Sequence, residues 1–559
     1  MKQMMIATAV LALTACAAGG QTSDTALTFD ASKGVPAQVT LPRGQVVNYT
    51  AYMRNYYVAN VEDSTYQYLN IYVPEGATQS SPIFMPNSVG GYMAGPPGNI
   101  DANGATGRAL LEGYVVVMPG ARGRNSTSTV EGQTIYNGRA PRGLLDLKAA
   151  VRYLRHFDAQ IPGNKERIFT NGTSAGGAMS ALLGTTGNNP AYEPYLEAMG
   201  AANERDDVFA SVCFCPIIDL EHADMAYEWL YACTNDSVRN LTDAQREVSA
   251  ELAALYPDYL ASLGLINPAD GTPLTIDNYT DYLREYLIAS AQEAKDAGAD
   301  IATNLGFQLG SAQGFQAPLN GGMPQGGPQG AQGPGGQRPD GQGPQGMQGG
   351  PQGMQGAPQG GPMGGQGPSG QRPDGQGPQG GPQGMGRPQM GQPGGMMRMG
   401  GGRTGETITG LDLTTYLCYV ASTTRLKTPP AFDSQGVAEG RSSGENQEFG
   451  DDTGSSVNFT DYSLRHATGD VDATIDADLA ERVRLLNPMR MAIDPSSTVA
   501  AHWYIRHGAR DRDTSFPVPI NFATRLMNQG RNVNFKLPWN RPHSGDYALN
   551  ELFAWMNSL

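Results

Sequence analysis

The sequence is short of the features that mark several classes of protein. Its 38 lysines and arginines stand against 53 aspartates and glutamates, and the resulting net charge of −15 argues against nucleic acid as a partner. Beyond the first few residues, no stretch is long and apolar enough for a membrane-spanning helix. Only five cysteines occur in 559 residues, and one of them, Cys16, lies near the N-terminus. For the other four we expect buried thiols or one disulfide and no metal site: Cys213, Cys215, Cys233 and Cys418.

The N-terminus is typical of a targeting segment rather than of a fold. Lys2 precedes an apolar stretch at 4–13 that is too short to cross a bilayer permanently. It ends in Leu-Thr-Ala-Cys, which resembles a bacterial lipobox and implies cleavage before Cys16 and lipidation of its thiol. An ordinary secretory signal cut nearby is the alternative. Both predict an exported protein, and the lipobox predicts a lipid anchor at the cell envelope, periplasmic or surface-facing.

One short motif organises the rest of the chain. Gly172-Thr173-Ser174-Ala175-Gly176 follows an apolar run and precedes a run of small, helix-forming residues. Strand, tight turn and helix with Gly-x-Ser-x-Gly at the turn indicate the nucleophile elbow of α/β-hydrolases. The glycines remove Cβ atoms that would collide at such a turn. The backbone N–H of Ala175, at the start of the helix, is a candidate oxyanion donor. The alternative is a small-residue turn without function.

The flanking patterns predict the fold class. Apolar runs at 82–86, 113–119 and 208–212 alternate with the elbow strand and with a helical pattern at 143–157, which is doubly wound α/β order. The first run leads into Gly90-Gly91, where such enzymes carry their second oxyanion donor. We therefore predict an α/β-hydrolase fold with a mostly parallel sheet and a large inserted lid. The expected segments are a signal peptide 1–16, a tether 17–26, hydrolase parts 27–221 and 491–559, and a lid 222–490.

Within the predicted lid, residues 316–403 are of low complexity. Glycine, proline, glutamine and methionine dominate, and Gly-Gln-Arg-Pro-Asp recurs from Gly336 and from Gly370. This composition cannot bury a core, so we expect the segment to be disordered. The glycine triplets break at Pro339, which excludes collagen. An expanded loop without an essential role is favoured over adhesion or spacing.

A serine nucleophile needs a base, and the base needs an orienting acid. Among six histidines, His543 lies in a polar turn after the last predicted strand, where α/β-hydrolases carry the base; His507 is the second candidate. Asp511 and Asp513 follow the preceding strand, and both satisfy the order Ser, Asp, His along the chain. Spacing alone does not choose between the two aspartates.

Four motifs together resemble the subtype B bacterial tannases, which are α/β-hydrolases related to feruloyl esterases. The match runs through both halves of the hydrolase domain, and its motifs are Ser-Val-Gly-Gly-Tyr-Met from Ser88, Gly-Thr-Ser-Ala-Gly-Gly from Gly172, His-Trp-Tyr-Ile-Arg-His-Gly from His502 through Asp511-Arg512-Asp513, and Pro-His-Ser-Gly-Asp-Tyr from Pro542. The resemblance implies that Asp511 is the triad acid and that Asp513 contacts the galloyl ring. The fungal tannases, which tie acid and base together through neighbouring cysteines, fit less well because the neighbours here are Arg510 and Pro542.

Two lid motifs extend the resemblance to the substrate. It implies that Lys427 and Glu445 contact the galloyl hydroxyls, with Glu448 as the alternative to Glu445. Carboxylates accept strongly from phenolic hydroxyls, and a lysine can donate to a phenol oxygen. Such a polar site rejects rings that lack these hydroxyls, because its buried groups would go unpaired. The 316–403 segment is foreign to compact family members, so the family implies nothing about its role.

The sequence therefore predicts a serine esterase acting on galloyl esters through an acyl-enzyme, with no metal or organic cofactor required. Within enzymes, the alternatives are an esterase for ferulate or another plant phenolic and a serine peptidase on the same fold. A third alternative is a surface binding or adhesion protein with a vestigial hydrolase domain. It predicts that deleting 316–403, rather than Ser174→Ala, abolishes function. The partner is a small phenolic ester, and the oligomeric state is open.

Overall fold

The computed structural model describes residues 27–311 and 406–559. The signal segment 1–16 with Cys16, the tether 17–26 and the low-complexity segment 316–403 lie outside the described residues. The strands are β1 (Val35–Thr40), β2 (Val46–Tyr56), β3 (Tyr68–Pro74), β4 (Pro82–Pro86), β5 (Val115–Pro119), β6 (Ser128–Val130), β7 (Gln133–Ile135), β8 (Asn164–Thr173), β9 (Ala210–Phe214), β10 (Phe307–Ser311), β11 (Glu406–Leu411), β12 (His502–Arg506) and β13 (Asn532–Lys536). The helices are α1 (Ala105–Leu111), α2 (Arg142–His156), α3 (Ala175–Thr185), α4 (Glu193–Ala198), α5 (Leu220–Tyr231), α6 (Asp243–Leu263), α7 (Ile276–Asp296), α8 (Leu413–Thr423), α9 (Gly444–Glu448), α10 (Asp461–Thr468), α11 (Ala477–Leu485), α12 (Pro488–Met491), α13 (Pro517–Asn528) and α14 (Leu549–Asn557).

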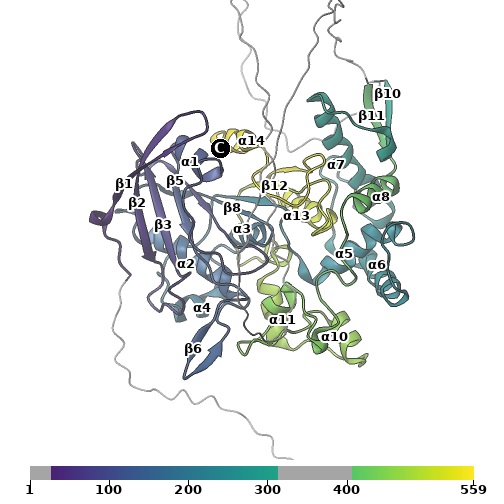
Figure 1. Ribbon diagram of the computed structural model, residues 1–559, viewed down its shortest axis with the longest axis horizontal. Helices are drawn as coiled ribbons and strands as arrows, with labels where there is room; N and C mark the ends of the chain where they lie inside the picture. Colours follow the sequence, from purple (N-terminus) through teal and green to yellow (C-terminus); the bar gives the residue numbers. More distant parts are fainter. Residues whose placement is uncertain (1–26, 312–405) are drawn as a thin grey trace, which may run out of the picture. The chain divides into compact units, whose positions relative to one another are not determined.

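A nine-stranded sheet in the order β1-β2-β3-β5-β4-β8-β9-β12-β13 forms the centre of the described fold (Figure 1). The six strands from β5 to β13 run parallel, and β1, β2 and β3 add an antiparallel edge. The predicted α/β-hydrolase fold with a mostly parallel sheet is confirmed. The strand bounds differ from the expected runs by a few residues, since apolar character continues past the last ladder hydrogen bond.

Alternate residues of the central strands pack into two separate cores. Val115 and Val117 belong to one buried cluster, whereas Val116 between them belongs to the other. Ile83 and Phe84 on β4 divide in the same way. The apolar runs seen in the sequence follow from this, because a parallel strand covered on both faces has no solvent side for polar residues.

The strand register brings three chain segments to one edge of the sheet. Thr173, at the end of β8, pairs with Phe214 of β9, and Phe214 pairs with Arg506 of β12. The residues that follow these strand ends therefore lie in a row at the carboxyl edge. Ligand and catalytic sites of open α/β sheets form at this edge.

Between β9 and β12 the chain leaves the sheet for helices α5–α12 and the antiparallel hairpin β10/β11. Helices α5, α6, α7 and α8 lie together, away from β1 and β2 (Figure 1). Helix α6 begins at a capping box of Thr242 and Gln245 and ends at Gly264, whose φ of 59° closes the last turn. The lid boundaries 222 and 490 stay predictions. Within 27–311 and 406–559, every helix is too short or too polar to cross a membrane.

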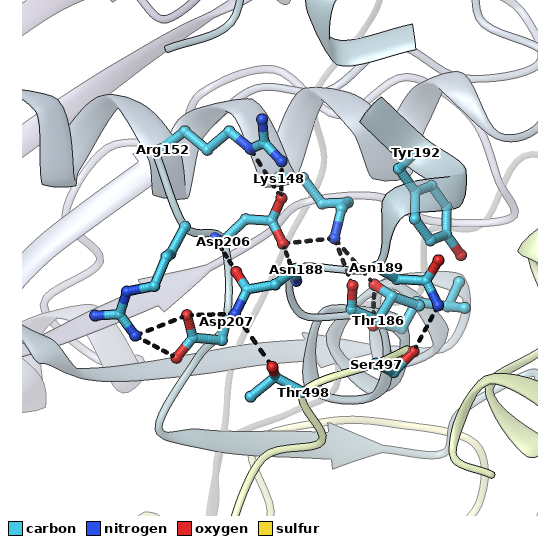
Figure 2. Close-up of polar contacts among 12 residues, drawn as sticks. Lys148, Arg152, Thr186, Asn188, Asn189, Tyr192, Asp206, Asp207, Ser497 and Thr498 are labelled. Atoms are coloured by element: carbon cyan, nitrogen blue, oxygen red, sulfur yellow. Dashed lines mark hydrogen bonds and ion pairs between the residues drawn. The ribbon is translucent and has the colours of Figure 1, made fainter. Parts of the chain in front are cut away.

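At the amino edge of the sheet, a buried polar network joins α2 to the segment before β9 (Figure 2). Lys148 and Asp206 are completely buried and form an ion pair of 2.7 Å, and Arg152 adds a second contact to Asp206 at 2.8 Å. Lys148 also donates to the carbonyl of Thr186, directly after α3. Burial alone would raise the pKa of Asp206, but the charges of Lys148 and Arg152 outweigh it and lower this pKa.

The four cysteines of the described residues are all free thiols. Cys213 and Cys215 are buried, and Cys233 and Cys418 are at least partly exposed. Of the two expectations, buried thiols or one disulfide, the first holds for the pair on β9 and directly after it.

Candidate active site

Ser174 lies on the turn between β8 and α3 in a strained backbone conformation, with φ 63° and ψ −127°. The turn is tight because glycines flank it. A Cβ on Gly172 would meet the carbonyl oxygen of Gly176 at 2.1 Å, and a Cβ on Gly176 would meet the carbonyl oxygen of Val89 at 2.7 Å. The N–H of Ser174 donates to Phe214 on β9 at 2.9 Å and fixes the turn to the sheet. Strand, strained serine and helix are the geometry of a nucleophile elbow.

Asp511 and His543 form a hydrogen bond of 2.7 Å between Oδ2 and Nδ1. Asp511 is buried after β12, whereas the His543 side chain is 19% exposed on the turn after β13. Burial alone would lower the pKa of His543, but its hydrogen bond to the Asp511 carboxylate and its contact with Cys215 outweigh burial and raise this pKa to about 10. The carboxylate, in turn, is held at a pKa of about 2: burial opposes ionisation, and His507 and His543 outweigh burial. The pair thus has the form of a base with its orienting acid.

The turn that carries His543 packs directly on the serine turn. A Cβ on Gly545 would overlap Thr173 Oγ1 at 1.9 Å, and Asn171 donates to Asp546 at 3.3 Å. The Tyr547 hydroxyl donates to the carbonyl of Pro542 at 2.6 Å and braces the turn from behind. The hydrogen bonds of the described residues include none between Ser174 Oγ and His543. Such contacts are often long in structures without substrate.

His507, the second candidate base, lies beneath Asp511 rather than at the surface. It is fully buried, and its Nδ1 lies 3.6 Å from the Asp511 oxygen that contacts His543. Within residues 27–311 and 406–559, neither ring nitrogen of His507 has a hydrogen-bond partner. Cys215 is also buried beside this pair, with its sulfur 3.2 Å from the Tyr547 hydroxyl. Of the two histidines, His543 is the one that reaches solvent.

The Gly90-Gly91 loop follows β4 and is tied to the serine turn by Asn87. The Asn87 amide donates to the carbonyls of Asn171 and Gly176 at 3.1 and 3.0 Å. Gly91 has a φ of +56°, so a side chain there would be strained. Both loop glycines are exposed. Ala175 is the first residue of α3, and its N–H therefore has no acceptor within the helix.

Asp513 and Lys427 lie on two sides of one tyrosine, Tyr227 of α5. Asp513 is one-third exposed, with Oδ2 3.9 Å from His543 Nδ1. The Tyr227 hydroxyl accepts the N–H of Lys427 at 2.9 Å and donates to the carbonyl of Arg512 at 2.8 Å. The Lys427 ammonium lies 3.8 Å from the centre of the Phe432 ring. Asp513 is thus close to His543, and the backbone of Lys427 is linked through Tyr227 to Arg512, the residue before Asp513.

Glu445 and its alternative Glu448 lie on α9 in different environments. Glu445 is partly exposed, and its charge raises the pKa of buried Tyr92 in addition to the larger effect of burial. Glu448 is completely buried, which raises its pKa well above the ordinary value, and one carboxylate oxygen has no hydrogen-bond partner. Glu445 is therefore the more accessible of the two carboxylates, whereas Glu448 is enclosed by the protein.

Three groups among the described residues bring possible metal ligands within 4.8 Å of one another. They are Cys215–His507–Asp511, Asp511–Asp513–His543 and Asp219–Glu221–His222. In the first two, Asp511 is already hydrogen-bonded to His543. In the third, Asp219 is hydrogen-bonded to His222, Tyr259 and Asn487. Internal contacts thus account for these carboxylates, and we assign none as a metal centre.

Sequence reasoning missed the residues that hold the predicted ones in place. Asn87, Cys215, Tyr227 and Tyr547 contact the predicted residues or the turns that carry them, from separate parts of the chain. Asn87 and Tyr547 had a local signal, since Asn87 directly precedes one of the motifs already singled out and Tyr547 ends another. The roles of the others depend on which strands and helices are neighbours, which a single sequence does not state.

Comparisons with known proteins agree with this geometry. A family model described as BD-FAE matches residues 69–257. Esterase LipC of Mycobacterium tuberculosis is 32% identical over 90 residues, which are 16% of this chain. The match spans 22% of the length of that relative.

Similarity to solved structures extends over nearly the whole chain. The tannase from Lactobacillus plantarum is 33% identical, with a TM-score of 0.70, over 95% of this chain and 99% of that chain. A tannin acyl hydrolase in complex with ethyl gallate is 34% identical, with a TM-score of 0.70, over 95% and 98%. The Fusobacterium nucleatum tannase is 30% identical, with a TM-score of 0.71, over 96% and 99%.

Proposed function

The chain belongs to the bacterial tannases and is a carboxylic ester hydrolase, and from this premise we propose that it hydrolyses galloyl esters with Ser174, His543 and Asp511 as its triad. The observation that carries the proposal is the 2.7 Å hydrogen bond between Asp511 and His543, on a turn that packs against the serine elbow. The order Ser, Asp, His along the chain agrees with this geometry. His507 is too deeply buried to serve as the base.

In the proposed mechanism, His543 Nε2 takes the proton of Ser174, and Ser174 Oγ attacks the ester carbonyl. Asp511 keeps the proton of His543 on Nδ1 and stabilises the imidazolium that forms. The N–H of Ala175 and of the Gly90-Gly91 loop meet the oxyanion. The alcohol leaves with the proton from His543. Water, deprotonated by His543, then releases gallate.

Recognition of the ring is assigned to Lys427, Glu445 and Asp513. The support is their placement: Asp513 lies beside His543, Lys427 is linked to the Arg512 backbone through Tyr227, and the charge of Glu445 acts on Tyr92. Two carboxylates can accept from phenolic hydroxyls, and the ammonium can donate to a phenol oxygen. Glu445 is preferred to Glu448 because it is partly exposed. A tannin acyl hydrolase similar to this chain has been solved in complex with ethyl gallate, which supports a galloyl ester as the ligand.

The test is hydrolysis of methyl gallate beside methyl ferulate, with Ser174→Ala and Lys427→Met as variants. We expect kcat/KM for gallate to exceed that for ferulate by about 100-fold or more, since buried polar groups penalise a ring that lacks their partners. Ser174→Ala should abolish both activities, whereas Lys427→Met should reduce the preference. The matched control is Lys33→Met, which removes the charge of an exposed lysine. Equal turnover of both esters would leave an esterase without the proposed galloyl site.

Export and lipid attachment through Cys16 are part of the proposal. They are supported by the sequence at 2–16 alone. The cell-envelope location is consistent with an extracellular ester as substrate. Fatty-acid labelling of the protein expressed in a bacterial host, lost in Cys16→Ala, is the expected result; labelling that persists in the variant would contradict it.

A further inference from the structure

Three consecutive carbonyl groups of the glycine loop accept hydrogen bonds from the protein. The carbonyl of Gly90 accepts the N–H of Met93 at 3.0 Å. The carbonyl of Gly91 accepts Arg124 Nε at 2.8 Å, and that of Tyr92 accepts the Arg124 N–H at 2.8 Å. Within residues 27–311 and 406–559, the N–H of Gly91 has no acceptor. The loop thus has its acceptors satisfied and keeps a free donor, as an oxyanion site requires.

The side chain of Arg124 also contacts α9, the helix that carries Glu445. A second guanidinium nitrogen donates to the side-chain oxygen of Gln447. A Cβ on Gly444, the first residue of α9, would lie only 3.3 Å from Arg124 Nε, so the helix begins directly against the guanidinium. One planar group therefore joins the glycine loop to the helix that carries a proposed ring contact.

The backbone around Arg124 is packed tightly on the glycine loop. Ala121 and Gly95 exchange both of their backbone hydrogen bonds, at 2.9 and 3.0 Å. A Cβ on Gly123 would lie 2.4 Å from the carbonyl carbon of Met93, so no side chain fits between the two segments. The backbone of Arg124 is therefore fixed against the loop, and only its side chain extends to α9.

Two parts of the proposed site thus share one arginine. In the proposed function, Glu445 contacts the ring and the Gly90-Gly91 loop meets the oxyanion. A ring bound at Glu445 restricts the motion of α9, and the restriction reaches the Gly91 carbonyl through Gln447 and Arg124. An acyl group too small to reach Glu445 gives no such restriction. The donor loop is then held less firmly during the attack on the ester carbonyl.

We propose that Arg124 is a positioning residue that couples occupation of the ring site to the oxyanion loop, so that an aromatic acyl group accelerates its own transfer to Ser174. The inference rests on the proposed function, because it takes Glu445 as a ring contact and the glycine loop as the second oxyanion donor. Arg124 itself acts through Gly91 and does not touch the substrate. Its effect belongs in kcat rather than in KM, since an oxyanion donor acts on the transition state.

The first test measures kcat and KM for methyl gallate, and kcat/KM for p-nitrophenyl acetate, in Arg124→Met and Arg124→Lys. Arg124→Met is expected to lower kcat for methyl gallate by about 10- to 100-fold, less than outright loss of an oxyanion donor, because the donor stays but is held less firmly. The acetate value should fall by less than about five-fold, since an acetyl group does not engage α9. Arg124→Lys should recover only part of the loss, because an ammonium lacks the planar fork that holds Gly91 and Gln447 together. Arg441→Met, which removes an exposed arginine, is the matched control.

A second variant, Gln447→Leu, separates coupling from simple support of the loop. It removes the contact with α9 and keeps the hydrogen bond between Arg124 and Gly91. We expect it to lower kcat for methyl gallate by about three- to ten-fold, the equivalent of one hydrogen bond, and to affect p-nitrophenyl acetate several-fold less. Added to Arg124→Met, it should cause no further loss. Ser442→Ala, which removes the other hydrogen bond of the Gln447 side chain, is its control.

Three outcomes would overturn the coupling. They are equal losses on both esters in Arg124→Met, a rise in KM with unchanged kcat in that variant, and additive effects in the double variant. Failure of the proposed galloyl specificity would look different. Wild type would then turn over methyl gallate and methyl ferulate equally, while the loss in Arg124→Met would stay larger on both aromatic esters than on the acetate.

Discussion

One carboxylate oxygen of Asp511, Oδ2, lies near two imidazoles. It is 2.7 Å from His543 Nδ1 and 3.6 Å from His507 Nδ1. His543 reaches solvent, whereas His507 is fully buried. The accessible imidazole is the one able to exchange protons with a substrate. The carboxylate sets the pKa of that imidazole, and this effect can be measured.

Asp511→Asn is expected to lower kcat/KM by about 10³- to 10⁴-fold through loss of the correct tautomer. It should also move the acid limb of the pH profile. The base must be neutral, so kcat/KM rises with pH through the pKa of His543, which Asp511 raises. Removing the carboxylate lowers this pKa, and the limb shifts to lower pH. Since the pKa of His543 is raised to about 10, steady-state rates between pH 6 and 11 check this, with substitution of the exposed Asp270 to Asn as control; an unmoved limb would contradict the assignment.

At the scale of single residues, the sequence predicted the proposed catalytic residues better than the residues that hold them in position. Ser174 stands in a motif whose backbone demands are visible in its glycines, and His543 follows the last strand. The choice of Asp511 over Asp513 came only from family resemblance, since both follow β12. Cys215 meets Asp511 through strand register, which nothing local in the sequence announces, whereas His507 lies only four residues before Asp511.

Among the elements, α5 joins the inserted segment to the residues that follow β12. Tyr227 contacts Lys427 and Arg512, and Asp224, one turn earlier, accepts the backbone N–H groups of Phe432 and Asp433. Helix α5 therefore helps to position the segment that begins at Lys427, together with Arg239, which donates to the carbonyl of Lys427. The sequence predicted a helix here but not its role, because its contacts are with residues about 200 positions away.

Tyr227→Phe is expected to raise KM for methyl gallate by about five- to ten-fold with a smaller change in kcat. The lost hydroxyl leaves the Lys427 N–H without its acceptor, at a cost of about 1–3 kcal/mol, and loosens the ring site rather than the triad. Tyr462→Phe, which removes a hydroxyl bonded to Glu251 on the exposed side of α10, is the matched control. An equal loss on p-nitrophenyl acetate would show that the whole inserted segment had been disturbed instead.

At the scale of the whole described fold, the residues proposed for catalysis lie at the carboxyl edge of the sheet, and a buried ion-pair network lies at the amino edge. The carboxyl edge carries Ser174 and the residues around it, and the Lys148–Asp206 network at the amino edge joins α2, α3 and the segment before β9 (Figure 2). Helix α3 spans the distance between them, roughly 16 Å for its 11 residues. Stability and activity should therefore respond to different substitutions.

Asp206→Asn is expected to lower the free energy of unfolding by about 3–5 kcal/mol at pH 7, because it leaves Lys148 buried without its charge partner. The folded fraction should keep its kcat/KM. The lowered pKa of Asp206 means that its contribution is present above about pH 4 and is lost as the pH falls through the folded-state value. Urea unfolding at pH 7, 5 and 3 should thus show a weaker acid dependence in the variant. Asp281→Asn breaks an exposed ion pair with Arg284 and should cost less than about 1 kcal/mol; equal losses in both variants would refute this account.

The hairpin of β10 and β11 has a consequence for the gene. Ser311, the last residue of β10, pairs with Glu406, the first residue of β11. The segment between these positions therefore begins and ends at the same place in the fold. Codons can be gained or lost between these positions without moving either strand. The repeated Gly-Gln-Arg-Pro-Asp sequence at Gly336 and Gly370 is the product expected of such duplication. Sequencing this locus across isolates should therefore find alleles of many lengths, each flanked by the same two strands.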